Sequence, residues 1–182
     1  MATSSKLWRV RNPRTLPPLV LSTEQIDQFI RIANADPSLH ITRDVVLVLS
    51  ETGIRAGELC ELRVSDVDVA NNRLFIPGTR SEGRCVPLSP RALSALQSLL
   101  ARHPRSAFVL GEEPSRLLRR VSLSFRKISG QIGATGQSLH CLRRFFAKRL
   151  ASGGISPVTL ARLMGHSSSR LTERYYCKSA RS

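Results

Sequence analysis

Five residues spread along the chain have side chains that could together act on a phosphodiester: Arg55, His140, Arg143, His166 and Tyr175. A phosphodiester under attack passes through a pentacoordinate state with added negative charge on its nonbridging oxygens. Fixed guanidinium groups, each binding two oxygens, stabilise that state more than the ground state. An imidazole can accept the proton of a nucleophile or hydrogen-bond the phosphate. A tyrosine phenol, with an ordinary pKa of about 10, is a candidate nucleophile if its proton is removed or cations surround it.

The first arginine lies where a buried helix is expected to end. Arg55 follows an apolar run and Gly53, which favours a positioned side chain over a solvated one. Glu58 comes three residues later, on the same face of a following helix, and could orient the Arg55 guanidinium. The alternative is an ordinary ion pair on a helix surface, which contributes little to stability.

The second arginine and its histidine occupy the start of another expected helix. His140 and Arg143 are three residues apart and therefore share one helical face, while apolar side chains occupy the other. His166 follows Gly165 at a helix end, where it could equally be a capping residue. Packing in the core is the structural alternative for His140 and for the tyrosine.

Composition points to an anionic partner. The chain has 182 residues, and 28 Lys and Arg against 13 Asp and Glu give a formal charge of +15. Four of the 28 are lysines, which leaves 24 arginines, the residue whose planar fork suits phosphate. A charge of this size favours nucleic acid, although many single arginines are expected to be merely solvated.

The same composition excludes several classes of protein. Hydrophobic residues make up 41% of the chain, enough for a core and against disorder throughout. The longest apolar run, from Val45 to Leu49, is far shorter than the roughly 20 residues of a membrane span, and no secretory signal is present. The four cysteines show no paired spacing, so we expect reduced, mostly buried thiols and a cytoplasmic protein.

The elements that must position these residues are mainly helices. Apolar residues recur every three or four positions, which predicts helices over about 22–34, 42–53, 58–64, 89–100, 115–132, 138–151, 157–164 and 169–176. Two short apolar segments, 74–76 and 85–88, enclose a charged loop and predict a β-hairpin. The expected fold is therefore mainly α with a small antiparallel β-sheet, an α+β fold, and the chain shows no internal repeat.

Four motifs occur in an order that is more specific than any one of them. They are Thr52-Gly53-Ile54-Arg55-Ala56-Gly57-Glu58-Leu59, His140-Cys141-Leu142-Arg143, Leu163-Met164-Gly165-His166-Ser167 and Glu173-Arg174-Tyr175. In this order and context they resemble the catalytic domain of the tyrosine recombinases, the phage integrase family, from about Leu21 to Tyr175. The resemblance selects Tyr175 over the adjacent Tyr176 as nucleophile, because it lies nine residues after His166.

The resemblance implies a site-specific DNA recombinase or integrase of the kind that a mobile genetic element encodes. Such a domain cleaves one strand through a 3′-phosphotyrosine intermediate and rejoins it without ATP. Arg55, Arg143, His140 and His166 would surround the phosphate, with Glu58 in support. The expected partner is double-stranded DNA, with a homo-oligomer on it, dimer or tetramer, left open. No membrane, metal or cofactor is expected, and the place of action would be the nucleoid in the cytoplasm.

The chain departs from the family in the hairpin. The family usually has a lysine there that protonates the departing 5′-oxygen, but no lysine occurs between Lys6 and Lys127. The equivalent position falls on Thr79 or, in a loop one residue shorter, on Arg80. An arginine donates a proton poorly because its pKa exceeds about 12, so slow cleavage is expected. A catalytically weak or inactive DNA-binding remnant and a type IB topoisomerase-like activity therefore stay open as alternatives.

The sequence also predicts a domain organisation. Residues 1–20 carry prolines and arginines without an apolar period and are expected to form a basic arm or linker. Residues 21–182 would form the catalytic domain. The separate N-terminal core-binding domain of the family is expected to be absent.

Overall fold

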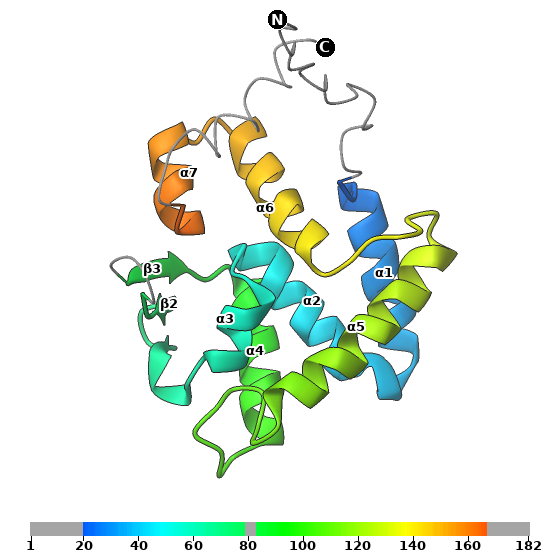
Figure 1. Ribbon diagram of the computed structural model, residues 1–182, viewed down its shortest axis with the longest axis horizontal. Coiled ribbons are helices and arrows are strands. Elements are labelled where there is room, and N and C mark those ends of the chain that lie inside the picture. The colour runs from blue at the N-terminus through cyan, green and yellow to red at the C-terminus, as the bar shows by residue number, and fades with distance from the viewer. Residues whose placement is uncertain (1–19, 79–82, 167–182) are drawn as a thin grey trace, which may run out of the picture.

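The computed structural model describes residues 20–78 and 83–166. Several predicted features lie outside these residues. They are residues 1–19 of the predicted arm, the hairpin positions Thr79 and Arg80, the predicted last helix over 169–176 and the candidate nucleophile Tyr175. The described chain is mainly helical with one small antiparallel sheet, so the predicted fold class is confirmed (Figure 1).

The first two long helices begin and end at local signals in the sequence. Helix α1 (Thr23–Ala35) begins with a capping box, in which the Ser22 hydroxyl accepts from the Gln25 amide and the Gln25 side chain accepts from the Ser22 amide. A short 3₁₀ turn (Pro37–Leu39) leads into α2 (His40–Thr52). Gly53 ends α2 in the left-handed conformation at φ 65°, as its position predicted.

The small sheet follows the third helix. Helix α3 (Ala56–Glu61) and a 3₁₀ turn (Val64–Asp66) precede the strands β1 (Val67–Asp68), β2 (Arg73–Ile76) and β3 (Arg84–Pro87). The strands are antiparallel in the order β1-β2-β3, and Phe75 pairs with Cys85. The hairpin of β2 and β3 was predicted from the sequence, whereas β1, only two residues long, was not.

Four helices complete the described chain. They are α4 (Pro90–Arg102), α5 (Pro114–Gln131), α6 (His140–Ser152) and α7 (Pro157–Met164). Ser89 caps α4 and Ser156 caps α7, and in each case proline occupies the next position. All four occur where the apolar period predicted them.

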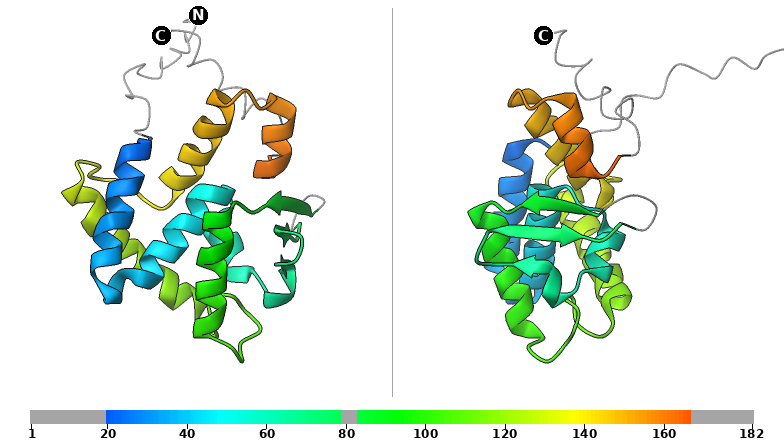
Figure 2. Two further views of the ribbon diagram at one scale, coloured as in Figure 1. Left: turned by 180° about the vertical axis from the view of Figure 1, so that it is seen from behind. Right: turned by 90° about the vertical axis from the view of Figure 1, so that its left-hand side faces the viewer.

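Helix α2 lies at the centre of the main core. It packs against α1, α4, α5 and α6, and its valines are buried on nearly all sides (Figure 1). Helices α6 and α7 share a second, smaller apolar cluster that contains Phe146, Leu160 and Met164. Helix α7 also packs against β3, and the sheet lies to one side of the helices (Figure 2). The C-terminal end of α7 therefore lies beside the hairpin.

The described cysteines differ from the prediction. Cys141 is buried and Cys60 is half-buried, but Cys85 is exposed. The prediction of mostly buried thiols is therefore wrong for Cys85, because that side chain lies on the outward face of β3, opposite to Val86. Within the same residues, no helix is both long and apolar enough to cross a membrane.

Candidate active site

Arg55 is placed by the junction between α2 and α3. It is the N-cap residue of α3 with an extended backbone, and the preceding Ile54 is buried and fixes the chain. Its side chain is 48% exposed. Its Nη1 donates to Glu58 Oε1 at 2.9 Å, and its backbone amide donates to Glu58 Oε2 at 2.6 Å. Glu58 therefore both caps the helix and orients the guanidinium, which the spacing of three residues anticipated.

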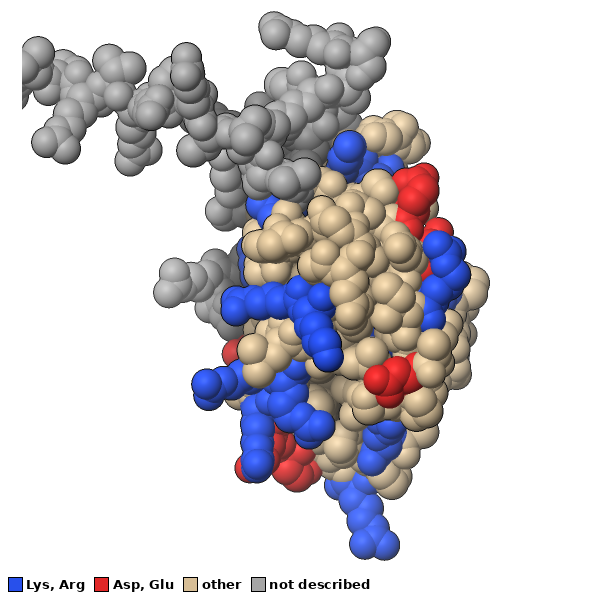
Figure 3. Space-filling model, turned by 90° about the vertical axis from the view of Figure 1, so that its right-hand side faces the viewer, with Lys and Arg blue, Asp and Glu red and all other residues tan. Residues whose placement is uncertain are grey.

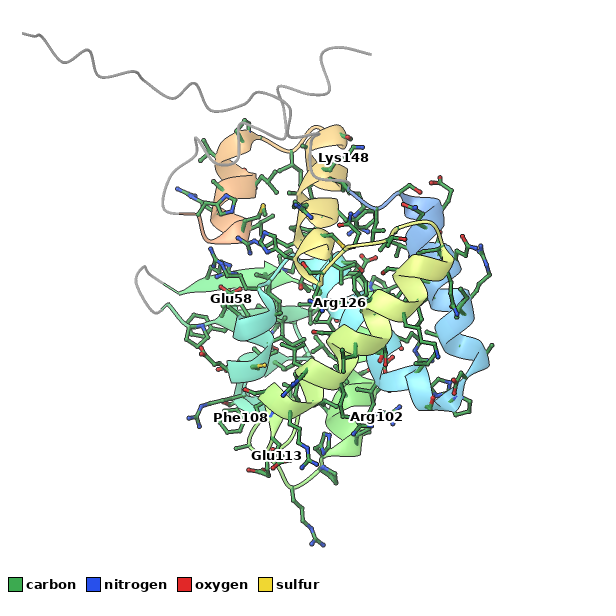
Figure 4. All side chains as sticks on the ribbon, turned by 45° about the vertical axis from the view of Figure 1, so that its right-hand side comes forward. Glu58, Arg102, Phe108, Glu113, Arg126 and Lys148 are labelled. Carbon is green, nitrogen blue, oxygen red and sulfur yellow. The ribbon has the colours of Figure 1, made fainter. Side chains whose placement is uncertain are left out.

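Glu58 has a second arginine partner that the sequence did not identify. Arg84 Nη1 donates to Glu58 Oε1 at 3.0 Å and Arg84 Nη2 to Oε2 at 2.8 Å, so each carboxylate oxygen accepts one bond from each arginine. Figure 4 shows Glu58 at the junction of α3 and the hairpin, below the end of α7. Burial raises the pKa of Glu58, but the hydrogen bonds from Arg84 and Arg55 outweigh it and hold that pKa below its usual value.

A signal for Arg84 exists in the sequence. Residues 84, 86 and 88 share one face of the strand by the period of two, and Val86 and Leu88 are buried. An arginine in register with two buried apolar residues points inward, where it needs an acidic or carbonyl partner. The side chain of Arg84 is only 14% exposed.

Arg143 is the buried arginine of the site. The residue is 4% exposed, and it lies on α6 one turn after His140. Its Nη1 donates to the Gly53 carbonyl at 2.7 Å, and its Nη2 donates to the Met164 carbonyl. The guanidinium thus lies between the end of α2 and the end of α7, held by backbone atoms from distant parts of the chain.

His140 begins α6 and is exposed to solvent. Partial desolvation lowers the pKa of its imidazole. The nearby guanidinium groups of Arg144, Arg143 and Arg55 lower it further. The imidazole is therefore uncharged at neutral pH, so one ring nitrogen can accept a proton.

His166 follows the glycine that ends α7. Gly165 is left-handed at φ 59°, and the His166 amide donates to the Ala161 carbonyl at 3.0 Å. Desolvation lowers the pKa of His166 to about 4. The positive charges of Arg143, Arg55 and Arg84 add to this effect. His166 is also neutral at pH 7, which makes it a hydrogen-bonding group and not a fourth cation.

The predicted residues converge from three places in the chain. The end of α2 and start of α3 supply Arg55 and Glu58, the start of α6 supplies His140 and Arg143, and the end of α7 supplies His166. The predicted positions Arg80 and Tyr175 lie outside the described residues. Two guanidinium groups beside two neutral imidazoles can bind a phosphate diester, neutralise added charge on it and exchange protons with it.

Comparison with known proteins shows the family of the chain. The sequence model of the phage integrase family matches residues 20–181, which is most of the chain. The chain belongs to the phage integrase family. Tyrosine recombinase XerC of Roseiflexus castenholzii is 28% identical over 171 residues, covering 87% of this chain and 54% of that protein. The transposase from transposon Tn916 of Enterococcus faecalis is 26% identical over 204 residues, covering 94% and 50%.

Solved structures of a recombinase and of a transposon integrase share the fold. The crystal structure of XerA recombinase has a TM-score of 0.73 at 24% identity, covering 92% of this chain and 61% of that one. The Tn1549 transposon integrase in complex with circular intermediate DNA has a TM-score of 0.73 at 22% identity, covering 90% and 64%. The chain thus spans about half the length of the curated relatives described above.

Proposed function

We propose that the chain is the catalytic domain of a tyrosine recombinase, and that it cleaves and rejoins one strand of duplex DNA at a specific site. The observation that carries this proposal is the pair Arg55 and Arg143 beside two imidazoles of lowered pKa, His140 and His166. The phenol oxygen of Tyr175 attacks the phosphorus, the bond from phosphorus to the 5′-oxygen breaks, and the 5′-oxygen leaves as a hydroxyl. A 5′-hydroxyl reverses these steps, with no net hydrolysis.

Each described residue has a distinct part in this scheme. Arg143 and Arg55 neutralise the nonbridging oxygens as negative charge develops on them. His140 accepts the phenol proton or hydrogen-bonds the phosphate, for which its lowered pKa keeps it unprotonated. His166 hydrogen-bonds a phosphate oxygen. Glu58 acts through Arg55 and is a positioning residue.

A basic helix supports double-stranded DNA as the partner. The exposed basic residues of α5 are Arg116, Arg119, Arg120, Arg126 and Lys127. Within the described chain, the one ion pair among these residues joins Arg116 to Glu113. Figure 3 shows more basic than acidic side chains on the side that α1 and α5 occupy in Figure 1. Helix α5 packs against α3, which begins beside Arg55, so one duplex could contact both.

The hairpin residue Arg80 is proposed to contact DNA in place of the family's lysine. Because its guanidinium holds its proton too tightly to serve as a general acid, the departing 5′-oxygen takes its proton from water or from another group. Strand cleavage by this chain is therefore proposed to be slower than that of a lysine-bearing relative.

Assembly and location follow from the proposed reaction. Exchange of strands between two DNA sites needs at least two copies of the chain, so we place a dimer or tetramer on DNA. Residues 1–20, with their arginines and prolines, would form a basic arm that contacts the phosphate backbone. The protein would act in the cytoplasm on nucleoid or mobile-element DNA.

A nicked suicide substrate tests the proposal, with DNA fragments from the region beside the gene as candidate sites. Cleavage releases a short 5′-hydroxyl strand that diffuses away, so the protein stays joined to DNA and migrates as a larger species in a denaturing gel. We expect the adduct with the wild type and with Tyr176→Phe, and none with Tyr175→Phe. Tight binding by the wild type with no adduct would instead establish an inactive DNA-binding remnant.

The topoisomerase alternative has its own experiment. A recombinase should leave a supercoiled plasmid that lacks its site unchanged, whereas a topoisomerase would relax it. Relaxation that is lost in Tyr175→Phe would replace the recombinase assignment by a topoisomerase-like one.

A further inference from the structure

The C-terminal end of α7 receives three arginines. Three successive carbonyls, those of Leu163, Met164 and Gly165, accept hydrogen bonds from Arg84, Arg143 and Arg55 respectively. These carbonyls lie at the negative end of the α7 dipole, where cations bind favourably. The three arginines come from β3, α6 and the start of α3. Hydrogen bonds therefore connect the end of α7, which precedes His166, to β3, to α6 and to the start of α3.

Arg84 makes the most extensive of these connections. Its Nε donates to the Leu163 carbonyl at 2.9 Å, while Nη1 and Nη2 donate to the two oxygens of Glu58. One nearly buried guanidinium thus joins the hairpin, α3 and α7. A lysine ammonium could not reproduce this pattern, because it lacks the planar fork that spans both carboxylate oxygens.

Gly165 leaves room for this guanidinium. A Cβ atom at position 165 would lie 2.7 Å from Arg84 Nη1 and 2.9 Å from Cζ, closer than real Cβ contacts. Any side chain there would displace Arg84 or the end of α7. The left-handed backbone of Gly165 adds a separate preference for glycine.

We propose that Arg84 is a positioning residue for the two sides of the site, holding Glu58 for Arg55 and the end of α7 for His166. The proposal rests on the proposed strand-cleavage function. Without Arg84, the Glu58 carboxylate would be free to turn both oxygens toward Arg55 and neutralise the charge that the phosphate needs. DNA affinity should change little, because Arg84 is nearly buried and its three donor atoms are engaged.

Single-turnover adduct formation at saturating DNA separates positioning from binding. We expect Arg84→Met to lower the rate by about 30-fold and Arg84→Lys by about 5-fold, since small misplacements of catalytic groups can cost up to about 100-fold. The dissociation constant for DNA should stay within about 3-fold. The matched control is Arg73→Met, on the neighbouring strand, which removes an exposed pair with Asp68 and should leave the rate unchanged.

A double-mutant comparison tests the suggested cause. In the wild-type background Glu58→Gln should slow adduct formation, because Arg55 loses its orienting partner. In the Arg84→Met background the same change should cost much less, because it also removes the carboxylate that would neutralise Arg55. Equal losses in the two backgrounds would overturn the coupling through Glu58.

A readout without cleavage keeps the two proposals distinguishable. Proton NMR can follow the four histidines, with the His166 signal assigned by its loss in His166→Gln. The positive charges that lower the pKa of this imidazole are those of Arg143 from α6, Arg55 from the start of α3 and Arg84 from β3. In Arg84→Met the pKa of His166 should rise above about 4, because one of three nearby positive charges is lost and the released end of α7 exposes the imidazole to more water, while thermal unfolding stays cooperative.

If the wild type forms no adduct, the proposed function is overturned. The His166 titration then still tests whether Arg84 positions the end of α7. Wild-type rates and an unchanged His166 titration in Arg84→Met would overturn the role of Arg84 and leave the proposed function standing.

Discussion

Arg143 and Arg55 serve one proposed phosphate from two very different environments. Arg143 is 4% exposed and donates to the carbonyls of Gly53 and Met164, whereas the Arg55 side chain is 48% exposed and pairs with the Glu58 carboxylate. A carbonyl fixes a guanidinium without cancelling its charge, while a carboxylate fixes it and opposes its charge. The site thus combines a buried cation held by carbonyls with a half-exposed cation held mainly by a carboxylate.

The two arginines should therefore differ in how much each contributes to folding stability. Arg143 is part of the packed interior, so its loss should affect folding as well as chemistry. Arg55 lies at a helix start and its side chain is half exposed, so its loss should lower the rate of the chemical step with little effect on folding. Substitutions at the two arginines and at the glycine that holds Arg143 should therefore differ in their effects on stability.

The strongest prediction concerns the backbone that holds Arg143. A Cβ atom at Gly53 would lie 2.2 Å from Phe146 Cδ1, and the residue has φ 65°. Gly53→Ala should therefore lower the free energy of unfolding by about 3 kcal/mol, from overpacking and backbone strain combined. Urea unfolding measures this. Gly57→Ala is the control, because no atom lies within 4 Å of the new Cβ, and it should be neutral or slightly stabilising.

Removal of each guanidinium tests the comparison itself. Arg143→Met should cost about 2 kcal/mol of stability, because the Gly53 and Met164 carbonyls lose a charged donor in a buried place. Arg55→Met should change stability by less than about 0.5 kcal/mol. Equal losses in urea unfolding would show that the two environments do not differ as described.

The lowered pKa of His166 gives the stability of the protein a pH dependence. The pKa of His166 is lowered to about 4 in the folded protein, against about 6.5 when unfolded. The unfolded chain therefore binds the proton more tightly, and stability should fall as the pH drops from 6.5 toward 4. Between pH 6.5 and 5 the decline should be shallower in His166→Gln, as measured by urea unfolding. An identical decline would contradict the lowered pKa.

The smallest predicted effect is in the hairpin. Arg80→Lys should raise the single-turnover cleavage rate of ordinary DNA by several fold, because a lysine can protonate the departing 5′-oxygen. A 5′-bridging phosphorothiolate substrate, whose sulfur leaves without a proton, is the control. If the substitution accelerates both substrates equally, the missing lysine does not limit cleavage through proton donation. Thr79→Lys tests the other possible alignment of the loop.

Local signals made much of the helical framework predictable. The capping box at Ser22 and the glycine at Gly53 fixed the beginning of α1 and the end of α2 to within a residue. Arg55 and Glu58, three residues apart, form the pair that a helical spacing implies. Sequence reasoning works well where the partners are neighbours along the chain.

The contacts that the sequence did not reveal join distant segments. Arg84 lies 26 positions from Glu58 and 79 from Leu163, and Arg143 lies 90 positions from Gly53. No periodicity relates such partners, and only the packing of β3, α6 and α7 brings them together. Because Arg84 shares a strand face with Val86, the sequence indicated that its side chain is buried. It did not indicate which groups accept hydrogen bonds from that side chain.

The central claim is that Arg143 and Arg55 neutralise charge on one scissile phosphate. A methylphosphonate substrate tests it directly, because a methyl group replaces one charged nonbridging oxygen. On ordinary DNA, Arg143→Ala and Arg55→Ala should each slow adduct formation by about 100-fold or more. On methylphosphonate DNA most of that loss should disappear for both variants, while Tyr175→Phe stays inactive. Losses that are equally large on the two substrates would contradict the account.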